Sequence, residues 1–161
     1  MKGGQITTNL DERTAHEITS KNYDELMCQL CPWGSSDVWH MIKTAEAVNL
    51  NMYELAEILQ DQAENWGINL YNDNPTTDVN ALLNDYILNQ ARNNIEKLTG
   101  IDIVNDYGVY FFANYLDCPL QYSTEVQEAI EKAIKEKELK ESDFNTYSLY
   151  VLNEMYISIE Q

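Results

Sequence analysis

Apolar residues recur every three or four positions along most of this chain, which is the spacing of one face of an α-helix. The clearest case runs from about Asn51 to Asn65 and ends near Gly67. Its apolar side, which we expect to be buried, holds Met52, Leu55, Ala56, Leu59, Ala63 and Trp66. The pattern therefore predicts an amphipathic helix with one buried and one solvent-facing side.

Five further segments have helical spacing, over residues 23–30, 35–48, 78–99, 124–134 and 143–159. Side chains suited to helix capping open several of them, and Thr124 with Gln127 has the spacing of a capping box. Residues 1–20 show little periodicity and indicate a loose lead-in. Residues 101–116 suit a short strand and a buried helix equally well. We predict a mainly α fold, a single compact helical domain over 21–161 of about five to six helices, with a short strand pair around 101–112 as an option.

The charge of the chain is strongly one-sided. Its 27 acidic and 10 basic residues give a net charge of −17. Between Thr44 and Glu131 there are 15 acidic residues against only Arg92 and Lys97. Such a field repels nucleic-acid phosphates and anionic lipids, so we expect no direct nucleic-acid partner and no membrane partner. It attracts basic protein surfaces.

Four acidic residues of the 51–65 helix follow one another at helical spacing. Glu54, Glu57, Asp61 and Glu64 are three, four and three positions apart, on the side opposite the apolar residues. Further acidic candidates for a partner-binding surface are Glu46, Asp73, Asp78 and Asp85. Tyr53 and Tyr71 flank the helix, and tyrosine is enriched at protein interfaces. These ten residues are the predicted partner-binding set.

The cysteine pattern gives only a weak metal signal. Cys28 and Cys31 form one Cys-x-x-Cys motif rather than two, and His16, His40 or Cys118 would have to complete a tetrahedral zinc site from distant positions. Buried core cysteines are the favoured interpretation, and we expect no metal and no cofactor. The Asn- and Asp-rich stretch over 69–78 lacks the glycine and the closing glutamate of a calcium-binding EF-hand.

No group of residues indicates catalysis, since the two histidines are N-terminal and no nucleophile motif is present. We therefore expect a protein that is not an enzyme. Residues 44–58 have the outline of a helix-turn-helix, but their outward acidic residues would be repelled by duplex DNA. A simple helical hairpin is the favoured interpretation.

Residues 1–9 lack the apolar core of a signal peptide, and no stretch approaches 18 uninterrupted apolar residues. The odd number of cysteines argues against a disulfide framework. We expect a cytoplasmic protein.

Two functional hypotheses follow. In the first, the chain inhibits a basic nucleic-acid-binding protein, such as a restriction or CRISPR nuclease, by presenting carboxylates where phosphates would lie; phages and mobile elements make small acidic inhibitors of this kind. In the second, it is a non-catalytic structural or adaptor domain that binds a protein through an aromatic or apolar patch, and its acidity serves only solubility. The partner and the oligomeric state are not predicted by the sequence.

Overall fold

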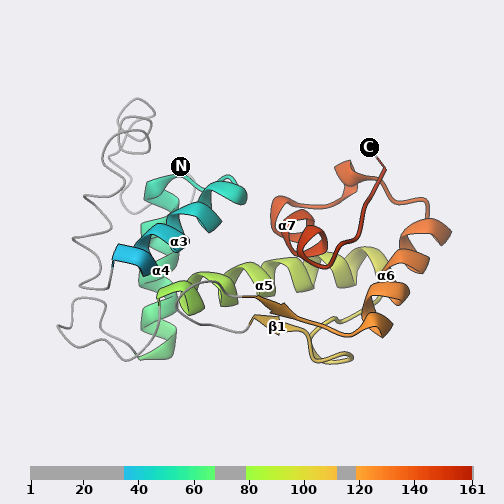
Figure 1. Ribbon diagram of the computed structural model, residues 1–161, viewed down its shortest axis with the longest axis horizontal. Helices are drawn as coiled ribbons and strands as arrows, with labels where there is room; N and C mark the ends of the chain where they lie inside the picture. The colour runs from blue at the N-terminus through green and yellow to red at the C-terminus, as the bar shows by residue number, and fades with distance from the viewer. Residues whose placement is uncertain (1–34, 68–78, 112–118, 161) are drawn as a thin grey trace. The chain divides into compact units, whose positions relative to one another are not determined.

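The computed structural model describes residues 35–67, 79–111 and 119–160 (Figure 1). Helices make up 66% of these residues. The helices are α3 (Ser35–Ala47), α4 (Met52–Trp66), α5 (Val79–Thr99), α6 (Thr124–Glu136) and α7 (Thr146–Glu154), with a short 3₁₀ helix, η1, at Glu141–Asp143. Strands β1 (Tyr110–Phe111) and β2 (Leu120–Gln121) pair antiparallel. The predicted mainly α fold is confirmed; of the strand pair expected around 101–112, β1 falls within that range and β2 lies outside it.

The chain divides into two compact units. Of the described residues, the first unit contains 35–67 and 79–83, and the second contains 84–111 and 119–160. The predicted lead-in over 1–20 and the predicted helix at 23–30 lie outside the described residues. The expectation of a single domain over 21–161 stays a prediction.

Local capping defines α4 in the first unit. The Asn51 side chain accepts a hydrogen bond from the Glu54 amide at 2.8 Å, and the Glu54 carboxylate accepts one from the Asn51 amide at 2.9 Å. This reciprocal capping box satisfies two backbone donors that the first turn of a helix leaves without partners. At the other end Gly67 adopts φ +72°, a left-handed conformation that costs glycine little. The predicted boundaries of this helix are confirmed.

Among the predicted apolar residues of α4, Met52 has no described side chain, and all but one of the others are buried. Leu55, Ala56, Leu59 and Ala63 are all at most 3% exposed, as predicted. Trp66 is 43% exposed, so the prediction that it is buried was wrong. Trp66 is the last residue of the helix, and the chain leaves the helix at Gly67. At a helix end, the angular position of a residue around the axis therefore does not determine whether other segments cover its side chain.

A buried amide links α4 to the start of α5. The Gln62 side chain is 9% exposed, and its Nε2 donates a hydrogen bond to the carbonyl oxygen of Leu82 at 3.0 Å. A buried polar group needs such a partner to offset its lost hydration.

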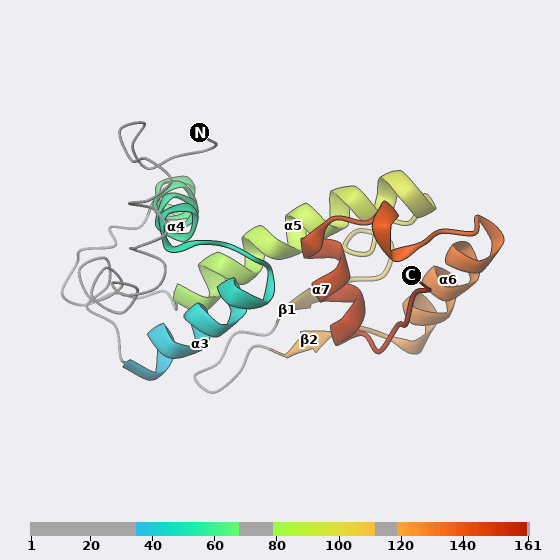
Figure 2. The same ribbon diagram turned by 90° about the horizontal axis from the view of Figure 1, so that it is seen from above.

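In the second unit, α7 lies against α5 (Figure 2). Asn145 caps α7 by accepting from the Ser148 amide at 2.8 Å. On α5, the Asn94 Oδ1 accepts from the Ser148 hydroxyl at 2.7 Å and from the Asn145 amide at 3.0 Å. The rings of Tyr86 and Tyr147 meet edge to face, with their centroids 5.6 Å apart.

The start of α6 differs from the prediction. Ser123 is the N-cap residue and makes no side-chain capping hydrogen bond, so the capping box predicted for Thr124 and Gln127 is not formed. Thr124 is instead the first residue of the helix. Of the five apolar positions that the helical spacing places inward, Val126, Ile130 and Ala133 are buried, whereas Ala129 and Ile134 are only half-buried.

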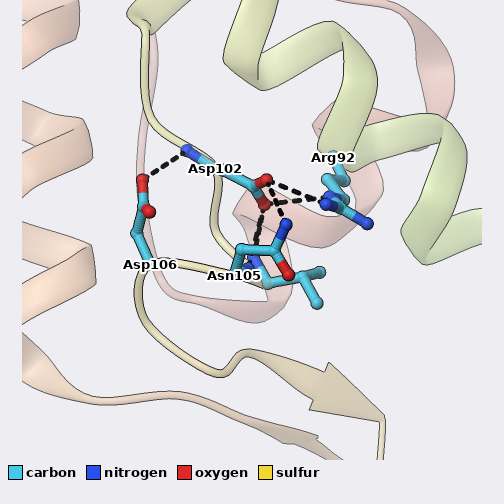
Figure 3. A network of polar contacts seen from close by, with 5 residues as sticks. Arg92, Asp102, Asn105 and Asp106 are labelled. Carbon is cyan, nitrogen blue, oxygen red and sulfur yellow. Dashed lines mark hydrogen bonds and ion pairs between the residues drawn. The ribbon is translucent and has the colours of Figure 1, made fainter.

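An ion pair organises the turn between α5 and β1 (Figure 3). The Asp102 carboxylate accepts from Arg92 Nε at 2.9 Å and from Arg92 Nη2 at 2.8 Å. It also accepts from the backbone amides of Val104 and Asn105 and from the Asn105 side chain. Asp106 closes the turn by accepting from the Asp102 amide at 3.3 Å. Residues 103–107 therefore form a turn, in the region where the pattern left strand and helix open.

Candidate partner-binding face

The acidic residues of α4 lie on the side of the helix that the core leaves exposed. At about 100° per residue, Glu54, Glu57, Asp61 and Glu64 fall within an arc of about 80°, roughly opposite the buried Leu59 and Ala63. Glu54, Asp61 and Glu64 are exposed, and Glu57 is half-buried. We call these four residues the α4 acidic face. The sequence prediction that they share one face is consistent with this arrangement.

Two members of the α4 acidic face have contacts of their own. The Glu54 carboxylate closes the capping box at Asn51, and Glu57 also has a polar or electrostatic partner. A carboxylate offers about four acceptor positions, so one capping hydrogen bond leaves capacity for a further donor. Asp61 and Glu64 are therefore the members most directly presented to a partner.

The spacing of the face can be compared with that of a phosphate backbone. Ten residues separate Glu54 from Glu64, which at 1.5 Å per residue is about 15 Å along the helix axis. One strand of duplex DNA carries a charge about every 3.4 Å along the axis, hence about four to five phosphates in the same length. Four carboxylates thus approach the charge density of one strand, and about half that of a duplex.

The other predicted binding residues are distributed differently. Glu46 is exposed on α3 and lies 3.8 Å from Lys43 Nζ, so part of its charge is compensated. Asp85 is half-buried on α5 in the second unit, where its Oδ2 accepts from Asn89 Nδ2 at 3.4 Å. Tyr71, Asp73 and Asp78 lie outside the described residues.

Tyr53 does not have the exposure that an interface tyrosine requires. It is 9% exposed and belongs to the core of the first unit. Its ring therefore offers little contact area to a partner. The prediction that Tyr53 is an exposed interface residue is corrected accordingly. Tyr53 lies in the first turn of α4 next to the exposed Glu54, so its burial is decided by tertiary packing and not by its position in the turn.

Of the residues named as weak metal-ligand candidates, the structure describes only His40. Cys28 and Cys31 lie outside the described residues, and His40 is half-buried on α3. Within residues 35–67, 79–111 and 119–160, no group of three or more His, Cys, Asp or Glu residues is arranged to hold a metal ion. The absence of a metal stays a prediction.

The Arg92–Asp102 pair is the polar cluster that the sequence did not predict. The hydrogen bonds from Arg92, and then that from the Asn105 amide, lower the pKa of Asp102 from 3.8 to about 2. The same contact with Asp102 raises the pKa of Arg92. Both oxygens of the Asp102 carboxylate accept hydrogen bonds from Arg92 and Asn105 within this cluster, which indicates a structural role.

Among the described residues, no helix is long and apolar enough to cross a bilayer. Comparisons with protein-family models, with curated proteins and with solved structures gave no significant match.

Proposed function

We propose that this chain is a non-enzymatic inhibitor that occupies the nucleic-acid-binding groove of a basic protein through the α4 acidic face. Restriction and CRISPR nucleases are the first candidates, as targets of an anti-defence protein from a phage or mobile element. The three cysteines favour a reducing compartment, so the proposal places the encounter in the cytoplasm.

The observation that supports this proposal most directly is the exposed row of carboxylates on α4, a helix without any Lys or Arg. Arginine and lysine side chains that hold a phosphate backbone can also pair with carboxylates. The net charge of −17 would speed the encounter with a basic groove and make it sensitive to salt.

The alternative is an adaptor domain that docks through an apolar or aromatic patch. Large exposed apolar side chains in the described ranges are Trp66, Tyr110 and Tyr156, which belong to α4, to β1 and to the turn after α7. They come from three separate elements, and the described residues give this alternative no further support.

The test compares two double charge reversals. Asp61→Lys with Glu64→Lys changes two exposed acids three positions apart on α4, and Glu128→Lys with Glu131→Lys makes the same change on α6. Each variant shifts the net charge by +4, from −17 to −13, so long-range attraction is weakened equally. Nucleases that the wild-type chain captures from host lysates would be eluted by a salt gradient and identified by mass spectrometry. They would then be purified, and titration calorimetry would measure their affinity for the wild-type chain and for each variant.

We expect the α4 variant to weaken binding by about 100-fold, since two charge-assisted contacts at about 1.5 kcal/mol each are lost. The α6 variant should change affinity less than about fivefold, and DNA or RNA should compete with the wild-type chain. An equal loss of affinity in the α4 and α6 variants would mean that only the net charge matters for binding, and not the α4 acidic face. Unchanged binding in the α4 variant would refute the proposal.

A further inference from the structure

The turn that follows α7 holds a large aromatic residue in an unusual conformation. Tyr156 has φ +61°, in the left-handed region, and is 81% exposed. Bulky residues rarely adopt this conformation, because Cβ approaches the following carbonyl oxygen too closely. Tyr156 is also the most exposed large apolar residue in the described ranges.

The backbone around Tyr156 explains why the conformation is imposed. The Tyr156 amide donates to the Asn153 carbonyl at 3.0 Å, and the Ile157 amide donates to the Leu152 carbonyl at 3.0 Å. This pair of hydrogen bonds is a Schellman motif, whose left-handed position is most often occupied by glycine. The buried Leu152 and Ile157 anchor the two sides of the motif. Glycine would fit this position at lower cost, and Tyr156, which is 81% exposed, buries little surface that would offset the strain.

The same turn is negatively charged. Helix C-termini carry a partial negative charge from their unpaired carbonyl groups, and Lys or Arg in the last turn commonly compensates it. The last turn of α7, which is described in full, contains no basic residue and ends with the exposed Glu154. By contrast, α6 has Lys135 in its last turn. An acid therefore lies where a base would be more stable.

We propose that the Glu154–Tyr156 turn is a contact site for an arginine side chain of a protein partner. The ring face of Tyr156 would stack on the guanidinium group, and the Glu154 carboxylate would supply the opposite charge. Strain kept at an exposed position is a recognised mark of function. The turn lies in the second unit and does not require the α4 acidic face, so this proposal can succeed or fail independently of the proposed function.

The test uses NMR to measure the chemical shift of the Tyr156 ring while an arginine peptide is added. The full chain, labelled with ¹³C at the tyrosine ε carbons, is titrated with a nine-residue arginine peptide and then a nine-residue lysine peptide, in 0.15 M NaCl. The Tyr156→Phe variant assigns the Tyr156 signal, and Tyr110, which is 50% exposed on β1, is the internal control. We expect the Tyr156 signal to shift at least about three times as far as that of Tyr110, more with arginine than with lysine. Glu154→Lys should suppress this difference.

A stability measurement separates a binding role from a structural one. Tyr156→Gly relieves the left-handed strain but enlarges the freedom of the unfolded chain, so we expect a net rise in the folding equilibrium constant of about three- to fivefold. Binding of the arginine peptide should weaken in the same variant. Equal shifts at Tyr156 and Tyr110, or a loss of stability in Tyr156→Gly, would overturn the proposal.

Discussion

The turn between α5 and β1 depends on the carboxylate of Asp102, and replacing it by the amide of asparagine tests this dependence. Asp102→Asn preserves shape and keeps one oxygen that can accept from the amides of Val104 and Asn105. It removes the charge that Arg92 contacts at 2.9 and 2.8 Å. The Arg92 side chain, 27% exposed, would lose its bidentate partner.

The expected cost can be worked from the pKa of Asp102. Its fall from 3.8 to about 2 in the folded state corresponds to about 2 kcal/mol, at 1.36 kcal/mol for each pKa unit. The carboxylate side chain is only 11% exposed, so solvent screens the pair little. We expect Asp102→Asn to lower the free energy of unfolding by about 2 kcal/mol at pH 7.

The pH dependence has a definite sign. Because folding depresses this pKa, the stabilisation is complete above the unfolded value near 4 and is lost as the pH falls through about 2. At pH 3 about half of it should be gone, so the difference between wild type and Asp102→Asn should shrink to about 1 kcal/mol. The other acidic residues titrate in both proteins, so their contributions cancel to first order when the free energies of unfolding of wild type and Asp102→Asn are subtracted.

Urea unfolding followed by circular dichroism at 222 nm measures both quantities. Tryptophan fluorescence is unsuitable, because Trp33, Trp39 and Trp66 all precede the second unit. Asp106→Asn is the matched control: it removes a charge from the same turn but keeps an oxygen that can accept from the Asp102 amide. Equal losses in the two variants, or a difference that is as large at pH 3 as at pH 7, would refute the assigned role of the ion pair.

Two further predictions concern helix ends. Asn51→Ala should lower the free energy of unfolding by about 1 kcal/mol in urea denaturation, because the α4 capping box is lost, whereas Glu54→Gln can retain it and should cost less; equal losses would contradict the capping role. Glu138→Gly should raise the melting temperature, with a gain of about 0.5–1 kcal/mol, because Glu138 has φ +53° at the end of α6. Gly67→Ala, at φ +72°, should show the opposite sign in the same calorimetric scan, and two changes of the same sign would refute the argument.

The sequence by itself was sufficient for features set within a few residues. The start and end of α4 follow from Asn51, Glu54 and Gly67, all of which act on backbone groups at most four positions away. The α4 acidic face follows from the 3.6-residue period and needs no knowledge of the partner helix. The excess of negative charge is likewise a property of composition.

Tertiary structure decided which side chains were covered and which distant groups met. Tyr53 is buried and Trp66 is exposed, the reverse of the predicted assignments, because coverage at the two ends of α4 depends on neighbouring segments rather than on period. The link from Asn94 to Ser148 joins residues 54 positions apart. Arg92 meets Asp102 because the chain reverses after Gly100, where φ is +80°. Such contacts depend on how the backbone closes its loops, which a local pattern of residues does not encode.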